Sequence, residues 1–373
     1  MSAFANFPPL DPVPLPAPVW LFKLLHETVL CLHFVVVQWV LGWLFIGLIW
    51  NLWGRSRRNT TMVAGSTRIA GSLPLLMTYL INFGIPPLLF AQVLYGNFLY
   101  TSSVLIGVWW ISVVGLVILT YSSIYAGSLR AAKAWWGYGL IALVLGVAIA
   151  KIYSTNMTLM LHPEAWGPMF RANAHGTGLP PHDPTLLPRW LLMLAGSLTL
   201  GGLALVVTGS GKKPGLAEKG FLVFNGGWIA AMGAVLQSTA AFSVFQTQPG
   251  AVLARLSENA LYHPLPIVWL GLAGAVVGVG LLAMTRREKA SLWLGSLAAG
   301  AGALLTAVTV IYRDGIRDMT LLAQGYNVWD MKVVANWPVV LLFLGVFVLG
   351  LLAMAWMISI ALHAKPAKEE PAP

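Results

Sequence analysis

The chain has 373 residues, of which 58% are hydrophobic and only 9% are charged, and its mean hydropathy is +0.78. This composition excludes an assembly of soluble domains and predicts an all-α polytopic membrane protein in a lipid bilayer. The formal net charge of +10 would suggest nucleic acid as the partner of a soluble protein. Here the basic residues fall in short loops between apolar segments, so no nucleic-acid partner is expected.

Nine apolar segments are long enough to cross a bilayer, at about 20 residues per crossing. They are residues 19–53, 70–97, 102–127, 134–155, 187–209, 220–245, 264–284, 290–312 and 337–363. We expect residues 19–363 to form a single transmembrane bundle. Residues 1–18 form a proline-rich outer arm before it, and residues 364–373 form a disordered cytoplasmic tail after it. The glycine-rich stretches 196–202 and 295–302 indicate close helix packing.

Lysine and arginine gather in the loops that follow the first, third, fifth and seventh spans. By the positive-inside rule these loops are cytoplasmic, so the N-terminus is expected outside and the C-terminus in the cytoplasm. The longer connections, 156–186, 246–263 and 313–336, then lie outside. Since loops on rigid helices commonly carry recognition, we expect partners to dock on this outer face.

The first span carries two histidines and a carboxylate in an otherwise apolar run. Ionisable side chains are expensive at membrane depth, so they usually face a protein interior, a water cavity or a cofactor. His26 and His33 are seven residues apart and share one helix face, about 10.5 Å apart along the axis. His33 is either a haem axial ligand or a histidine hydrogen-bonded to a neighbouring helix. His26 with Glu27 either serves a second cofactor or forms an interfacial polar pair.

Three further segments hold candidates, each with a plainer alternative. His263, at the start of a span, is a ligand from a facing helix or only an entry residue. Pro86 and Pro87 interrupt the second span near Gln92. This break indicates either a cofactor or proton-access site, or only a structural kink. Arg313 and Arg317, in the last outer connection, pair with haem propionates or with their own neighbouring aspartates. The single cysteine, Cys31, excludes a cysteine-based metal site.

Several of these segments resemble subunit I of the cytochrome bd quinol oxidases, a nine-helix haem protein. The matching segments are His33-Phe34-x-x-Val37-x-x-x-Leu41-Gly42, residues 81–97, Arg189-Trp190 through Gly209, and Gln246-Thr247-Gln248-Pro249. The resemblance implies that His33 is a ligand of haem iron. It also implies b-type or related haem, in unknown number, and a place in a bacterial cytoplasmic (inner) membrane.

The chain departs from that family at several functional positions. Gln92 stands where the family has a glutamate, and Leu192 where it has the low-spin haem histidine. The quinol loop is very short, and the Gly-Arg-Gln-Pro-Trp motif is absent near Arg313. These differences put quinol oxidation and proton delivery in doubt.

The expected function is that of a haem-binding, bd-like membrane redox subunit that transfers electrons. If it also reduces oxygen, a periplasmic cytochrome c would supply the electrons. Another membrane subunit of a respiratory complex is the second expected partner. The candidate catalytic residues are Glu27 and Gln92, and the cofactor-binding ones are His33, His26, His263, Arg313 and Arg317. The alternatives are a cofactor-poor membrane anchor of an electron-transfer complex and a transporter that uses the buried polar residues as a substrate path.

Overall fold

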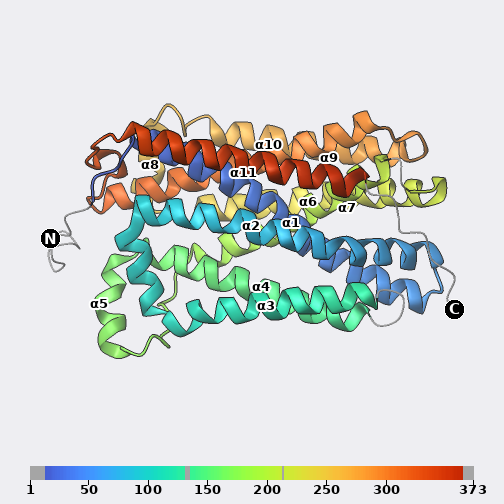
Figure 1. Cartoon of the computed structure of the whole chain (residues 1–373), viewed down its shortest axis with the longest axis horizontal. Coiled ribbons are helices and arrows are strands. Elements are labelled where there is room, and N and C mark those ends of the chain that lie inside the picture. Colours follow the sequence, from blue (N-terminus) through green and yellow to red (C-terminus); the bar gives the residue numbers. More distant parts are fainter. Residues whose placement is uncertain (1–12, 131–134, 212–213, 364–373) are drawn as a thin grey trace. The chain divides into compact units, whose positions relative to one another are not determined.

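The computed structural model describes residues 13–130, 135–211 and 214–363. Its helices are α1 (Val19–Ser56), α2 (Thr60–Leu105), α3 (Gly107–Leu129), α4 (Trp135–Leu159), α5 (Pro163–Ala172), α6 (Leu186–Ser210), α7 (Leu216–Gln246), α8 (Gly250–Glu258), α9 (Leu265–Thr285), η2 (Arg287–Lys289), α10 (Leu292–Ala323), η3 (Val328–Asp330) and α11 (Trp337–His363) (Figure 1). Within the described residues, nine helices are long and apolar enough to cross a membrane. The predicted all-α polytopic membrane fold is therefore confirmed.

The chain divides into two compact units, and the larger one runs from Lys23 to Val328. The smaller unit holds described residues 13–22 and 329–363, including α11. Within it, the backbone at Leu15 pairs with the segment before α11. The amide of Leu15 donates to the carbonyl of Lys332 at 2.8 Å, and the amide of Val334 donates to the carbonyl of Leu15 at 2.9 Å. Residues 1–12 of the predicted arm and the predicted tail lie outside the described residues.

The second helix is longer than the predicted span 70–97. It continues through Pro86 and Pro87 to Leu105, and the predicted third span begins instead at Gly107. The backbone leaves helical geometry at Tyr95, with φ −134° and ψ 27°. The irregularity in α2 is thus displaced from the prolines to a tyrosine that lies inside the bundle, where it is fully buried.

The tenth helix also extends beyond the sequence prediction. Residues 313–323, which we expected in an outer loop, continue α10 as far as Ala323. The reason is that Asp314, Arg317 and Asp318 recur at helical spacing and are all buried. Their charges are paired inside the bundle, so this stretch does not need solvent. The two other long connections hold the short helices α5 and α8.

Close glycine contacts hold α6 against its neighbours in the larger unit. A Cβ atom on Gly202 would lie 2.4 Å from the backbone nitrogen of Ala230 on α7. A Cβ on Gly42 of α1 would lie 1.9 Å from the carbonyl oxygen of Ser197. These approaches are shorter than real Cβ contacts, so only glycine allows them. The packing predicted for residues 196–202 is confirmed.

Replacing Gly202 by alanine should therefore push α6 and α7 apart. We expect Gly202→Ala to lower the free energy of unfolding by about 1–3 kcal/mol, the usual cost of overpacking. Gly300→Ala is the matched control, because a Cβ there meets no atom within 4 Å. Thermal unfolding of both variants in the same detergent measures the difference, and equal unfolding midpoints would contradict the close approach.

Candidate functional site

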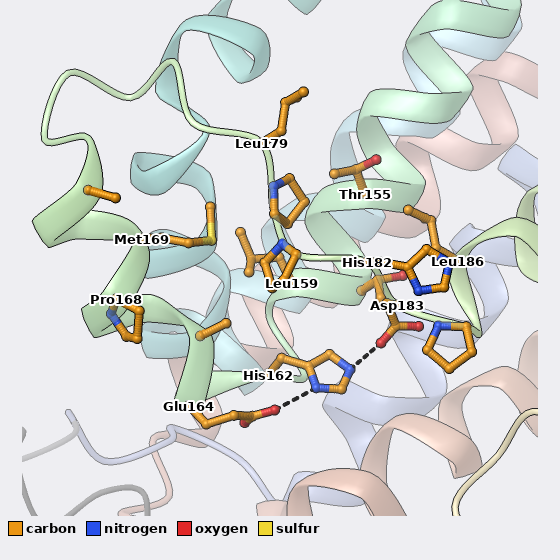
Figure 2. A pocket seen from close by; sticks show the side chains of 16 residues that line it. Thr155, Leu159, His162, Glu164, Pro168, Met169, Leu179, His182, Asp183 and Leu186 are labelled. Atoms are coloured by element: carbon orange, nitrogen blue, oxygen red, sulfur yellow. Dashed lines mark hydrogen bonds and ion pairs between the residues drawn. The ribbon is translucent and has the colours of Figure 1, made fainter.

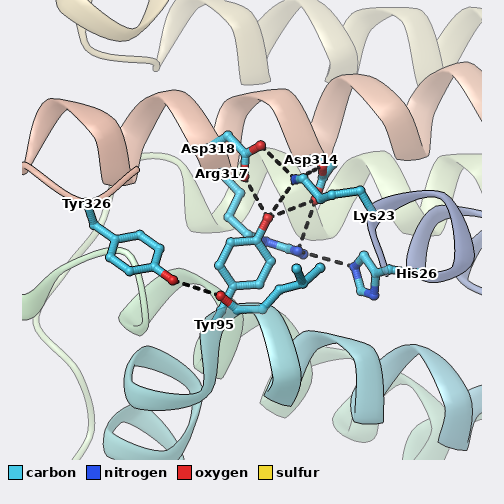
Figure 3. A network of polar contacts seen from close by, with 8 residues as sticks. Lys23, His26, Tyr95, Asp314, Arg317, Asp318 and Tyr326 are labelled. Carbon is cyan, nitrogen blue, oxygen red and sulfur yellow. Dashed lines mark hydrogen bonds and ion pairs between the residues drawn. The ribbon is translucent and has the colours of Figure 1, made fainter. Parts of the chain in front are cut away.

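A network of charged side chains lies buried among α1, α2 and α10 of the larger unit (Figure 3). We call it the buried network and define it as Lys23, His26, Glu27, Tyr95, Asp314, Arg317 and Asp318. Helix α1 supplies Lys23, His26 and Glu27, and α10 supplies the two aspartates and the arginine. Both sets have the spacing i, i+3, i+4, which places three side chains on one helix face. Tyr95 enters from the irregular turn of α2.

Lys23 lies at the centre of this network. Its Nζ forms an ion pair with Asp314. It also lies 2.6 Å from Oδ2 of Asp318, and this second ion pair does not have hydrogen-bond geometry. The same ammonium donates to the Tyr95 hydroxyl at 2.7 Å, and that hydroxyl donates to Oδ1 of Asp318 at 2.6 Å. One tyrosine thus links the lysine to a carboxylate through two short hydrogen bonds.

Arg317 extends the network to His26. Its Nη1 donates to Oδ1 of Asp314 and to Nε2 of His26, both at 3.2 Å. The Nδ1 of His26 donates to the carbonyl of Pro87 at 3.0 Å. Since an arginine has no acceptor, Nε2 must be the unprotonated nitrogen and His26 must be neutral. Both ring nitrogens are therefore occupied, and His26 has no free lone pair for a metal.

The three carboxyl groups of the network outnumber its two cations, which pair with the two aspartates only. Lys23 and Arg317 carry one positive charge each, whereas Glu27, Asp314 and Asp318 would together carry three negative charges. Among the described residues, no cation lies within ion-pair distance of Glu27, and a carboxyl group beside other carboxyls without a cation of its own is stabilised by a proton. One proton makes the network neutral. Glu27 is half-buried, whereas both aspartates are buried, so Glu27 is the accessible carboxyl of the network.

His33 lies apart from the buried network, farther along α1. Its Nδ1 donates to the carbonyl of Leu80 on α2 at 3.1 Å, and its ring packs against Gly84, where a Cβ would lie 2.9 Å from the ring. This hydrogen bond leaves the lone pair on Nε2, the arrangement typical of a histidine ligand. Within the described ranges, no three His, Cys, Asp or Glu side chains are grouped to hold a metal ion. Haem iron needs only one or two side chains, because the porphyrin supplies the rest.

The remaining sequence candidates are dispersed. His263 is exposed just before α9. Gln92 is partly buried one turn before Tyr95, and its side chain makes no hydrogen bond to another described residue. Arg313 lies over the ring of Phe34, with its Cζ 5.6 Å from the ring centroid. Of the two arginines expected to bind a cofactor, Arg317 is hydrogen-bonded to Asp314 and His26. Arg313 is hydrogen-bonded to neither of these residues.

Sequence reasoning missed Lys23 and understated Asp314 and Asp318. The signal was present: the spacing Lys23, His26, Glu27 near the start of one span is repeated by Asp314, Arg317, Asp318 at the end of another. Matching the two sets would have placed opposite charges on two facing helices. The position of Tyr95 had no such signal, because it depends on the irregular turn in α2.

A second cluster of titratable side chains lines a cavity of about 660 Å³ beside α5 (Figure 2). Its walls come from α4, α5 and the loop before α6, and they are mainly apolar. His162 bridges two acids, with Nδ1 2.8 Å from Glu164 and Nε2 2.6 Å from Asp183. Asp183 also accepts hydrogen bonds from Thr185. His162 therefore ties α5 to the loop before α6.

The two partners shift each other's pKa values. Hydrogen bonding to Asp183 raises the pKa of His162, although burial opposes this. Burial would raise the pKa of Asp183, but hydrogen bonds from His162 and Thr185 outweigh it and lower that pKa. Stability from the raised histidine pKa is lost as pH rises through it. Stability from the lowered aspartate pKa is lost as pH falls through it.

The contribution of this pair should therefore peak between the two unfolded pKa values, about 3.9 for Asp and 6.5 for His. We expect His162→Gln to lower the unfolding midpoint most near about pH 5.5 and progressively less at alkaline pH. His175→Gln, at an exposed histidine outside this cavity, is the control. Thermal unfolding across this pH range measures the difference, and a difference independent of pH would argue against the ion pair.

Comparison with known proteins finds neither a matching family model nor a matching curated sequence. The resemblance to subunit I of the cytochrome bd oxidases consequently rests on the sequence motifs alone.

Proposed function

We propose that the chain is a multi-pass membrane protein that exchanges a proton at the buried network. The observation that carries this proposal is the charge count: the network holds three carboxyl groups and two cations, and both cations are paired with the aspartates and not with Glu27. Intramembrane ionisable residues commonly mark ion pathways and proton relays. The network supplies both a proton that can leave and fixed charges that keep the site polar.

The residues have different roles in this proposal. Half-buried Glu27 holds the exchangeable proton and is the group that loads or releases it. Lys23 and Arg317 hold the aspartates in place by ion pairs. The Tyr95 hydroxyl accepts from Lys23 and donates to Asp318, with Oδ1 of Asp314 3.5 Å away, so it can pass a proton between the aspartates. Neutral His26 orients Arg317.

Replacing Glu27 should remove the exchangeable proton. We expect Glu27→Gln to abolish an infrared signal from a protonated carboxyl group near neutral pH and to slow proton exchange about 100-fold, in the range of general acid–base contributions. Glu27→Asp should retain part of both, because it keeps a carboxyl group. Glu258→Gln, at an exposed glutamate, is the matched control. A protonated-carboxyl signal that persists in Glu27→Gln would refute this role.

The second candidate function is the haem-binding redox activity expected from the sequence. The specific observation in its favour is the hydrogen bond from Nδ1 of His33 to Leu80, which leaves Nε2 free to bind iron. His33 would hold the haem, and bound haem would supply one-electron transfer. His26 does not fit a ligand role, because both of its ring nitrogens are engaged. Electron transfer at His33 and proton exchange at the buried network are compatible in one subunit.

Purified protein should test the haem candidate directly. We expect a Soret band and a positive pyridine haemochrome assay, both lost in His33→Ala because no second residue would replace its Nε2. His263→Ala should keep the spectrum, since this histidine is exposed near the start of α9. Haem-free wild-type protein would eliminate this candidate and leave proton exchange untouched.

The surroundings of the protein follow from the same proposal. We place the chain in a bacterial cytoplasmic membrane with its N-terminus outside, because the basic loops favour that orientation. The buried network, close to the start of α1, then lies near the outer surface. Another membrane subunit and a periplasmic cytochrome c are the partners that the redox candidate requires.

A further inference from the structure

Two buried glutamines meet at one point inside the larger unit. Gln38 lies on α1 and Gln237 on α7, and the two residues are only 4% and 2% exposed. Gly196 of α6 lies between them. A Cβ atom on this glycine would be 2.5 Å from Nε2 of Gln38 and 3.1 Å from Nε2 of Gln237. Both amide nitrogens are therefore close to one point, which has room because Gly196 carries no side chain.

These two amides have few hydrogen-bond partners in the protein. Oε1 of Gln237 accepts from the hydroxyl of Thr199 at 2.9 Å. Within the described residues, neither Nε2 donates a hydrogen bond, and Oε1 of Gln38 is buried without a donor. Exchanging the oxygen and nitrogen of the Gln38 amide would not change this, because neither end has a protein partner. Unpaired polar groups are expensive inside a membrane, so a further hydrogen-bonding group is required at this point.

One water molecule fits between the two nitrogens. Their distances of 2.5 and 3.1 Å from the Cβ position of Gly196 keep them no farther apart than two hydrogen bonds laid end to end, about 5.8 Å. Buried water characteristically binds polar groups that the protein leaves unsatisfied. The amides and the glycine are uncharged, so a neutral ligand suits them better than an ion. A water molecule here accepts one hydrogen bond from each amide, and both of its own protons point away from them.

A water molecule held in this way is a poor carrier of protons. A proton moves along water only where each molecule can accept it on a free lone pair, and both lone pairs of this water are occupied by N–H donors. Gln38 follows Glu27 by eleven residues, so the two share one face of α1, about 16.5 Å apart along the axis. Phe34 lies between them on this face, and the Cζ atom of Arg313 is 5.6 Å from its ring centroid. This fixed positive charge also repels protons.

We propose that the amides of Gln38 and Gln237 bind one water molecule, and that this water stops protons from crossing the bundle. The binding of water stands by itself, whereas the stop rests on the proton exchange proposed for Glu27. Proton exchange at the buried network is then confined to the side of the membrane nearest the network.

A structure of the purified full-length protein at a resolution that shows ordered water tests the binding. We expect one water within hydrogen-bond distance of Nε2 of both glutamines. Gly196→Ala should displace it, because the added methyl group takes its place. Gln38→Leu removes one donor, should also lose the water, and serves if the alanine variant does not fold. Amides bonded directly to each other, no ordered water between them, or the same water in the variant would overturn the proposal.

Proton leak into lipid vesicles that contain the protein tests the stop. A pH gradient is imposed, and a pH-sensitive dye inside the vesicles records its decay. The wild-type protein should leak slowly. We expect Gln38→Glu to raise the leak about tenfold or more, because a carboxyl group both accepts and releases a proton. Gln246→Glu, at an exposed glutamine at the end of α7, is the matched control and should leave the leak unchanged.

An unchanged leak in Gln38→Glu would overturn the stop, and so would a wild-type leak as fast as that of this variant. Adding Glu27→Gln to Gln38→Glu separates the stop from the proposed function. Loss of the extra leak in the double variant would make Glu27 the source of the protons and support both. If the extra leak persists, the amides still stop protons, but the proposed role of Glu27 fails.

Discussion

The buried contacts of Lys23 determine how three helices of the larger unit, α1, α2 and α10, lie against one another. An ammonium inside a helical bundle is tolerated only with close partners, and Asp314, Asp318 and Tyr95 surround it. Removing one partner from such a group leaves an unpaired buried charge, which is more costly than the pair itself is stabilising. Helices α1, α2 and α10 are therefore held in one register at this end.

The apolar contacts and the polar network impose different constraints. Gly42 and Gly202 let α6 approach α1 and α7 until their backbones are in contact. This contact requires only that the side chain is absent. The buried network instead requires specific side chains at specific positions, and an irregular turn of α2 brings Tyr95 to them. Close packing thus supplies a rigid frame, and the network supplies the ionisable groups to which we assign proton exchange.

The extent to which the site was predictable differs from residue to residue. His33, His26 and Glu27 stood out because polar side chains in an apolar span are rare and expensive. Arg313 and Arg317 also stood out, but as part of a loop, since hydropathy could not reveal that α10 continues to Ala323. Their roles then separated: Arg317 pairs with Asp314 and His26, whereas Arg313 lies over Phe34. The Arg317–Asp314 pair is local and was one of the sequence alternatives, but Arg317 and His26 are 291 positions apart, and no local pattern encodes their contact.

The sequence by itself determined the membrane-spanning class, the number of spans and the polar residues that they carry, because the cost of polar groups in lipid acts on each segment separately. Only the tertiary structure decided which charges meet. Lys23 could have faced lipid headgroups, and Tyr95 could have followed a regular helix. Their positions depend on the register between helices distant in the chain, which close packing and charge pairing establish together.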